Sequence, residues 1–202
     1  FFSGYLQVFA NKKAWPYIAT SMFASFSFFT FLTAVSFVYI SYFKVSEQGF
    51  ALLFGLNVSA LMLINFVNSR LVTRLGPQRM LTSGLIVAIM CASLLSIFNY
   101  MELGLWFTVI TIAPLMASLG LVATNADAMI LMRFPEHTGT ATAVIGTLRF
   151  GVGALAGPLL GMFYTGTALP FSLMMLAGTL CILMAQLLHY YHTKTSPNVN
   201  TP

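Results

Sequence analysis

Residues 15–43 read WPYIATSMFASFSFFTFLTAVSFVYISYF, a stretch without a single Asp, Glu, Lys or Arg. A helix needs roughly 20 consecutive, mostly apolar residues to cross the hydrocarbon core of a bilayer. This stretch is longer than that. Its apolar residues also do not alternate with polar ones, as they do in the strands of a membrane barrel. The sequence therefore predicts a membrane-spanning α-helix here.

Five further runs of the same kind follow along the chain. Ser46 and Glu47 supply a capping residue and a favourable first-turn charge ahead of the second run. Pro114 predicts a kink within the fourth run, and Pro170 suits the first turn of the sixth. The predicted spans cover residues 48–69, 80–99, 104–132, 138–164 and 170–191. The fold class that follows is an all-α membrane protein with six transmembrane helices over residues 15–192.

The composition agrees with a membrane protein. Of the 202 residues, 58% are hydrophobic and 6% are charged, whereas a soluble domain has about 25% charged residues. The net charge of +5 does not point to nucleic acid, because the basic residues stand singly or in pairs and form no basic face with interleaved aromatics. The expected partner is the lipid bilayer, and Cys91 and Cys181 are interpreted as small packing residues within apolar runs.

The distribution of basic residues predicts the orientation, because Lys and Arg accumulate on the cytoplasmic side. With the N-terminus inside, Lys44 is the one basic residue in a segment on the opposite side, and Arg149 lies within the membrane. The other seven fall in cytoplasmic segments: Lys12, Lys13, Arg70, Arg74, Arg79, Arg133 and Lys194. We therefore expect both termini in the cytoplasm, with residues 193–202 as a disordered tail.

Two charges lie inside predicted spans. Arg149 is near the middle of the fifth span, where a charge is expensive and needs a partner or a wet cavity. It is interpreted either as lining a transport path or as a structural tie. Asp127 lies near the cytoplasmic end of the fourth span. It either pairs with Arg149 across neighbouring helices, titrates during a transport cycle, or merely reaches cytoplasmic water.

Polar and adaptable side chains form three stripes at helical spacing. Each stripe has two interpretations: pocket or path lining, or ordinary contact between helices. The stripes are Asn57, Asn65 and Asn68 on the second span, Thr111, Ser118 and Asn125 on the fourth, and Met22, Ser25, Phe29, Thr33 and Ser36 on the first.

The loop after the second span, SRLVTRLGPQR at residues 69–79, resembles the loop signature of the major facilitator superfamily, Gly-x-x-x-Asp-Arg-x-Gly-Arg-Arg. The resemblance rests on Arg74, Gly76 and Arg79, while Ser69 and Thr73 replace the signature Gly and Asp. It implies a gating loop, although the arginines could equally be topology anchors. Physically, Gly76 is suited to a tight turn before a proline.

Several further segments look like the Bcr/CflA-type drug-resistance transporters of that superfamily: FGLN at 54–57, NSRLV at 68–72, ASLGLV at 117–122, FPEHTGTA at 134–141 and GTLRFGVGA at 146–154. The resemblance implies a twelve-helix protein of the bacterial inner membrane, of which this chain is the C-terminal half, built from two inverted three-helix repeats. It implies proton-driven export of drugs or small molecules without a cofactor. Residues 1–14 would then end the cytoplasmic linker that follows a missing N-terminal six-helix half.

The fifth span also carries a glycine pattern. Gly153, Gly157, Pro158 and Gly161 resemble the antiporter motif of the superfamily in its repeat-related position. Small residues at a spacing of four let helices approach closely. The expected role is a close, bendable helix contact.

Other classes of protein fit less well. An enzyme is not expected, because no nucleophile–base spacing or metal-ligand set stands out, apart from a weak His189/His192 pair. A channel would need filter-like rings of carbonyls or charges. Within the transporter class, an exporter of an amino acid, peptide or other metabolite stays open, as does a non-transporting six-helix scaffold.

Overall fold

The computed structural model describes residue 8 and residues 10–195, with the side chains of residues 192–195 excepted. It confirms the all-α class: six helical segments are long and apolar enough to cross a membrane, and the described residues contain no strand. The expected linker 1–14 and tail 193–202 lie partly outside the described residues.

The first span consists of α2 (Trp15–Ser36) followed by a π-helical turn, η1 (Phe37–Tyr42). Pro16 lies in the first turn, where its missing N–H has no partner to lose. The span ends near Phe43, as predicted, but its last turn is wider than an α-helix, which the sequence does not reveal.

The second and third spans meet in a tight turn. Helix α3 (Glu47–Leu75) begins at Ser46, whose hydroxyl accepts a hydrogen bond from the Gly49 N–H at 3.1 Å, so the predicted cap is present. Helix α4 (Pro77–Tyr100) follows after Gly76 alone. Gly76 has φ 82°, a conformation that favours glycine. Both helices extend into the loop that the hydropathy pattern assigned to residues 70–79.

The fourth span is α5 (Leu105–Leu131), which passes through Pro114 without interruption. The fifth span is divided into a 3₁₀ turn η2 (Pro135–His137), α6 (Thr138–Ala154) and α7 (Ala156–Met162). The division at Leu155 has a physical reason: Pro158 has no N–H to donate to the carbonyl of residue 154. The sixth span, α8 (Leu169–Thr195), continues past the expected start of the tail at residue 193.

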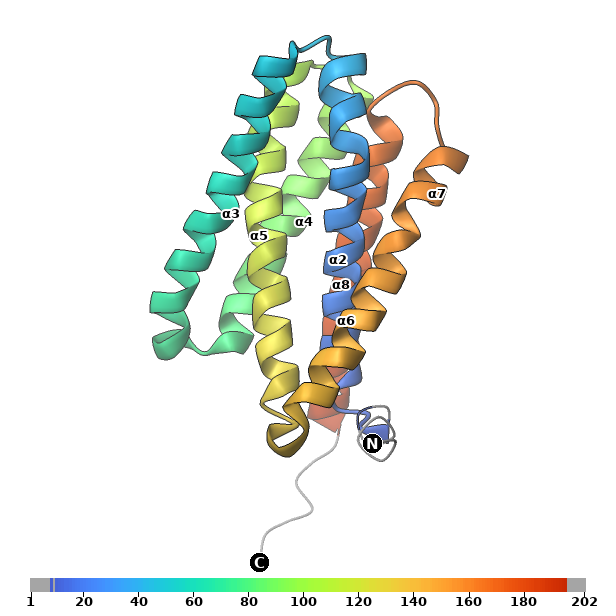
Figure 1. Cartoon of the computed structure of the whole chain (residues 1–202). Coiled ribbons are helices and arrows are strands. Elements are labelled where there is room, and N and C mark those ends of the chain that lie inside the picture. The colour runs from blue at the N-terminus through green and yellow to red at the C-terminus, as the bar shows by residue number, and fades with distance from the viewer. Residues whose placement is uncertain (1–7, 9, 196–202) are drawn as a thin grey trace, which may run out of the picture.

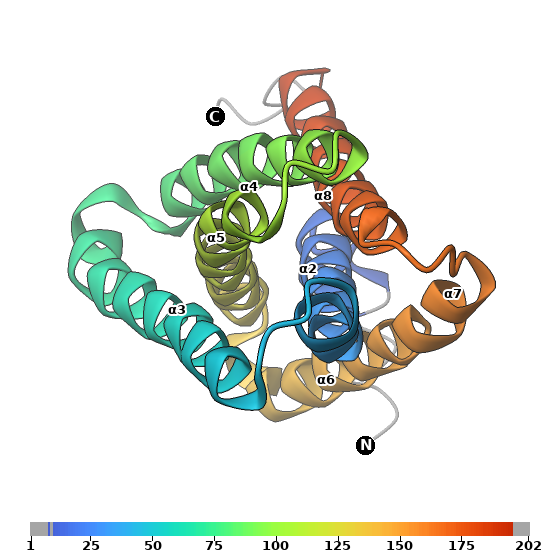
Figure 2. The same ribbon diagram turned by 90° about the horizontal axis from the view of Figure 1, so that it is seen from above.

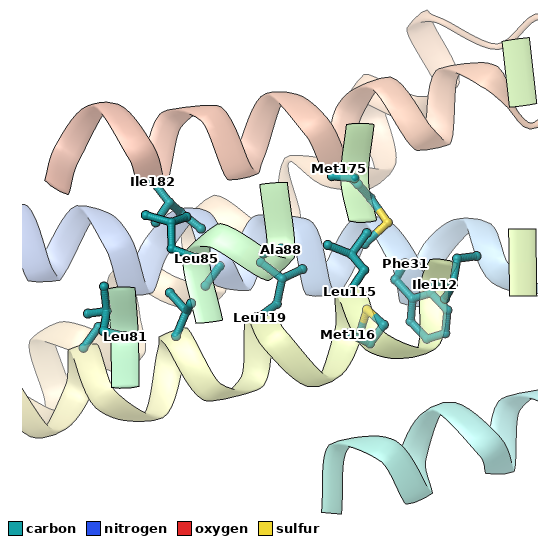
Figure 3. Close-up of a cluster of buried hydrophobic side chains, with 14 of the residues drawn as sticks. Phe31, Leu81, Leu85, Ala88, Ile112, Leu115, Met116, Leu119, Met175 and Ile182 are labelled. Atoms are coloured by element: carbon teal, nitrogen blue, oxygen red, sulfur yellow. The ribbon is translucent and has the colours of Figure 1, made fainter. Parts of the chain in front are cut away.

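Helices α2 and α5 lie at the centre of the bundle, and α3, α4, α8 and the α6–α7 segment surround them (Figures 1 and 2). The core is packed mainly among α2, α4, α5 and α8. Figure 3 shows their apolar side chains interlocking, with Leu85 and Ala88 of α4 beside Leu115 and Leu119 of α5. All four of these residues are buried. In lipid such a core holds through tight packing, because the solvent is as apolar as the side chains.

The packing depends on close backbone approach. A methyl group at Gly178 of α8 would overlap the Ser27 hydroxyl of α2, so these two helices touch through small residues. Helix α3 differs from the central helices, because only 6% of its most apolar window is buried.

The start of α2 and the end of α8 lie at the same end of the bundle (Figure 1), together with the α3–α4 turn. Lys12, Lys13, Arg74 and Arg79 therefore gather at one end, and Lys44 lies at the other. The bundle thus has the charge asymmetry that the sequence predicts, with Lys194 outside the described side chains.

Candidate functional site

The two charges predicted inside the membrane meet in the structure. The Nη1 of Arg149, on α6, lies 2.6 Å from the Oδ2 of Asp127, near the end of α5. The extended arginine side chain spans the difference in depth between the two positions. The hypothesised pairing across neighbouring helices is therefore present.

Two serines of α2 bind the ends of this ion pair. The Ser21 hydroxyl donates to the Asp127 Oδ1 at 2.6 Å, and the Arg149 Nε donates to the Ser25 hydroxyl oxygen at 2.7 Å. Ser21 and Ser25 are four residues apart and so lie one turn apart on one face of α2. Both are buried, and together they fix the pair against α2.

The pair also borders a hollow between α5 and α6. This hollow measures about 270 Å³ and is lined by Asp127, Leu131, Thr142, Ile145, Gly146, Arg149 and Phe150. The side chains of Arg149 and Asp127 are 36% and 25% exposed, so the pair is not sealed within this chain. An intramembrane charge of this kind is expected beside a wet cavity or a substrate path.

The pair has specific chemical capacities. A guanidinium has five N–H donors, and two of its nitrogens are occupied by Asp127 and Ser25, which leaves donors for a bound molecule. A proton on Asp127 would remove the charge that holds Arg149. Proton binding and the ion pair are therefore mutually exclusive at this position.

The asparagine stripe of α3 lies elsewhere. Asn125 of α5 donates to Asn68 at 3.0 Å, and Thr124 donates to Asn65 at 3.3 Å, so these side chains join α5 to α3. Asn57 is 3% exposed and donates to the Leu53 carbonyl. None of the three asparagines of α3 lines the hollow beside the ion pair. Of the two interpretations left open, these contacts favour ties between helices.

The polar stripe on α5 is also buried between helices. Thr111, Ser118 and Asn125 are all buried. Ser118 donates to the Pro114 carbonyl at 2.7 Å, and Thr111 donates to carbonyls one turn earlier, as hydroxyls in membrane helices do. Asn125 differs from these two hydroxyls, because its amide also reaches across to another helix.

The stripe on α2 is divided between two roles. Ser25 belongs to the ion-pair site, whereas Met22 is half-buried and packs against the apolar core. The half-buried Phe29 ring lies over Gly153 of α6 and meets the Phe150 ring edge-on at 5.8 Å. Phe29 therefore joins the helix contact to the edge of the hollow.

The glycine pattern of the fifth span is only partly a helix contact. A methyl group at Gly153 would overlap the Phe29 ring, and one at Gly157 would touch Thr33 of α2 at 3.9 Å. Gly161 was expected to do the same, but no described neighbour lies within 4 Å of its Cβ position. Gly161 instead borders a hollow shared with Thr33 and Ala34 of α2, so a close contact there stays a prediction.

The loop residues lie at the end of the bundle. Arg74 is in the last turn of α3, where a cation complements the helix dipole, and both Arg74 and Arg79 are exposed. When the loop is aligned on Gly76, Arg79 lies one residue beyond the final arginine of the signature. The turn at Gly76 is as expected, and a gating role stays a prediction.

Two features of the structure are not evident from the sequence. Ser21 is one of them, because one serine in an apolar helix carries no signal by itself. The other is a second polar group, which joins Tyr17, Gln78, Gln186 and His189. Gln78 and Gln186 are amides near the ends of apolar helices, and that position is the signal by which they could be found.

A six-helix membrane bundle with an ion pair held between three helices beside an open hollow defines a polytopic membrane protein of the transporter type. The comparison with family models then identifies the family. Residues 1–158 match the model described as the Major Facilitator Superfamily, and the chain belongs to that superfamily.

Curated relatives give a finer picture. The chain is similar to the "Bicyclomycin resistance protein homolog" of Haemophilus influenzae, with 31% identity over 94% of this chain and 47% of the relative. It is also similar to the "Uncharacterized MFS-type transporter YdgK" of Bacillus subtilis, with 28% identity over 73% of this chain and 36% of the relative. The chain thus spans less than half the length of these relatives. The resemblance to drug-resistance transporters of the superfamily is confirmed, as is a fold that forms half of the superfamily's architecture.

Proposed function

We propose that this chain supplies six helices of a proton-driven exporter of drugs or small toxic molecules in the bacterial inner membrane, with the Asp127–Arg149 pair on its transport path. The other six helices would come from an N-terminal half, and both ends of this chain would lie in the cytoplasm. The protein would act without a cofactor and without enzymatic chemistry.

One observation carries this proposal: two opposite charges within the membrane share a 2.6 Å contact and border a hollow. A buried charge costs free energy, and a purely structural tie could be sealed away from any cavity. Arg149 instead borders the hollow together with the apolar Phe150 ring. This combination suits a molecule that has hydrogen-bond acceptors and an apolar face.

The same pair offers a simple way to couple a proton to transport. While Asp127 is charged, it holds Arg149 and accepts the Ser21 hydroxyl. When Asp127 is protonated, the ion pair is lost and Arg149 keeps only its contact with Ser25. Arg149 would then be released to bind a substrate or to reorient α6 against α2.

Transport in cells tests the proposal. Cells that express the complete reading frame would be loaded with a fluorescent cationic dye and a panel of drugs, with and without a protonophore. We expect lower accumulation that disappears with the protonophore and with Arg149→Ala. The matched control is Lys13→Ala, because Lys13 is an exposed basic residue ahead of α2, outside the ion-pair site and outside the predicted gating loop.

Two outcomes would contradict the proposal. Unchanged accumulation of every compound, with the protein present in the membrane, would turn the interpretation to export of an amino acid, peptide or other metabolite. Equal effects of Arg149→Ala and Lys13→Ala would remove the ion pair from the transport path.

A further inference from the structure

A chain of polar side chains joins α2, α4 and α8 near the end of the bundle where α2 begins. The Tyr17 hydroxyl contacts the Gln78 Oε1 at 2.7 Å and the His189 Nε2 at 3.0 Å. The Gln78 amide donates to the Gln186 Oε1 at 3.3 Å, and the Gln186 amide donates to the Thr20 hydroxyl at 2.8 Å. This chain of polar side chains is separate from the ion-pair site on α5 and α6.

Four of these side chains border a hollow of about 610 Å³. Its polar groups, Tyr17, Gln78, Gln186 and His189, lie toward the ends of their helices. Besides Thr82 and Tyr190, its remaining wall is apolar and rises along α4 and α8, with one residue from α5, toward the middle of the membrane. These apolar residues are Leu85, Ile86, Ile89, Met129, Leu183 and Leu187. From Gln78 to Ile89 the wall rises roughly 16 Å at 1.5 Å per residue.

The groove lies on the outside of the bundle. Helices α4 and α8 lie side by side on the outside of the bundle in Figure 2, on the opposite side of α2 and α5 from α6. Ile86 and Leu187 line the groove and are 55% and 46% exposed, so the groove opens on an outer face of the bundle. An apolar outer face within spanning helices is expected to contact hydrocarbon. A groove that is polar at the membrane surface and apolar toward its middle matches the shape of an amphiphile.

The polar end has N–H donors that its own hydrogen bonds do not use. Each glutamine amide has two N–H groups. The contacts with Gln186 and Thr20 use one N–H of Gln78 and one of Gln186. Both amide oxygens already accept, one from Tyr17 and one from Gln78. The remaining N–H of each amide can donate to a ligand that supplies acceptor oxygens, such as a phosphodiester or a carboxylic ester.

The charge around this end favours an anion. The Arg133 guanidinium lies 4.4 Å from the centre of the Tyr17 ring, and exposed Arg79 follows Gln78 directly. Exposed Lys12 and Lys13 precede α2. The sequence has four acidic residues. Glu47 and Glu102 lie at the opposite end of the bundle, and Asp127 is paired with Arg149. Glu136 is then the one acidic residue that offsets the positive charge at this end.

We propose that this groove binds one anionic glycerophospholipid of the adjacent leaflet. Its phosphate and ester oxygens accept hydrogen bonds from Gln78 and Gln186, and Arg133 and Arg79 supply the positive field. One acyl chain lies along the apolar wall between α4 and α8. A cationic drug does not fit this site, because the same arginines repel it.

Native mass spectrometry of the complete purified protein tests this assignment without measuring transport. The probes are phosphatidylglycerol and phosphatidylcholine with identical acyl chains, titrated into the detergent-solubilised protein. We expect phosphatidylglycerol to bind at least tenfold more tightly than phosphatidylcholine. Arg133→Ala should weaken phosphatidylglycerol binding about tenfold, which is the usual size of a hydrogen bond or contact with a charged group.

Two further variants complete the test. Gln186→Glu keeps the size of the side chain but adds a negative charge, so it should weaken the binding of anionic phosphatidylglycerol more than that of phosphatidylcholine, which has no net charge. Arg70→Ala removes an arginine that stacks on the Phe66 ring of α3, away from the groove, and should change neither.

Equal binding of the two lipids to the unmodified protein would overturn the proposal. So would unchanged phosphatidylglycerol binding in both Arg133→Ala and Gln186→Glu, or tighter binding of a cationic amphiphile than of phosphatidylglycerol. Size-exclusion chromatography of each variant shows whether it is folded, and the phosphatidylcholine titration shows whether its lipid-facing surface is intact. Loss of drug export in cells bears on the proposed function and leaves this result unaffected.

Discussion

Asp127 and Arg149 depend on each other, because removing one partner of an ion pair in a low-dielectric site leaves the other charge uncompensated. The double exchange Asp127→Arg with Arg149→Asp keeps both charges. The Ser21 and Ser25 hydroxyls can donate to an acid or accept from an arginine, so they tolerate the exchange. We expect each single change to abolish dye efflux and the double exchange to restore part of it.

The measurement is the initial rate of efflux from preloaded cells at equal protein levels. Absence of any rescue by the double exchange would show that the pair is not an interchangeable contact. Its side chains would then act separately in the cycle.

Gly153 gives a prediction about packing. Alanine at this position would overlap the Phe29 ring, while alanine at the exposed Gly151 meets open space. Overpacking of this kind costs about 1–3 kcal/mol. Gly153→Ala should therefore lower the thermal unfolding temperature of the detergent-solubilised protein by several degrees, and Gly151→Ala should not. Similar unfolding temperatures for the two variants would mean that the Phe29 ring moves aside freely.

At the residue scale the sequence is informative wherever a charged side chain lies within an apolar helix. Arg149 and Asp127 are charges in apolar helices, so the sequence alone supports the hypothesis that they pair. Ser21 and the Tyr17–Gln78–Gln186 contacts cannot be inferred in this way, because serine, tyrosine and glutamine are tolerated in membrane helices. Their partners come from helices far apart in the sequence, and only the packing brings them together.

Among the elements, the division of the fifth span at Leu155 has a testable cause. Pro158→Ala restores an N–H that can donate to the carbonyl of residue 154 and so should join α6 and α7 into one helix. We expect a higher unfolding temperature and slower efflux, because a straight helix cannot bend at this point. The matched control is Pro77→Ala, since Pro77 lies in the first turn of α4, where no N–H is needed.

Thermal unfolding curves and efflux rates of the two proline variants check the proposed cause of the division at Leu155. A Pro158→Ala protein with a normal efflux rate would show that transport does not use the bend. A change of the same size in Pro77→Ala would show that the effect is not specific to the division of the span.

Hydropathy locates the elements because a spanning helix must be apolar over its whole length. It misplaces their ends where a helix continues beyond the apolar run. Helix α3 was expected to end at Ser69 but reaches Leu75, since Arg70 and Arg74 are good helix formers that extend into water or headgroups. The π-helical turn Phe37–Tyr42 depends on packing at the end of the bundle and leaves no sign in composition or spacing.

For the whole molecule, the charge asymmetry predicts the orientation. Single cysteines at the exposed positions Lys44 and Lys13, in a protein whose Cys91 and Cys181 are replaced by alanine, would lie on opposite sides of the membrane. A membrane-impermeant maleimide should label Lys44→Cys in intact cells and Lys13→Cys only after permeabilisation. The reverse pattern would invert the proposed orientation and move the lipid groove to the other leaflet.

The weak burial of α3 has a consequence for how the protein is made. Helix α3 is held to α5 by the Asn68–Asn125 and Asn65–Thr124 contacts, yet it is synthesised two helices earlier. At about 5–20 residues per second, its amides wait several seconds at the translocon before their partners emerge. During that interval Asn65 and Asn68 lack their partners on α5, so the contact between α3 and α5 can form only after the fourth span has emerged.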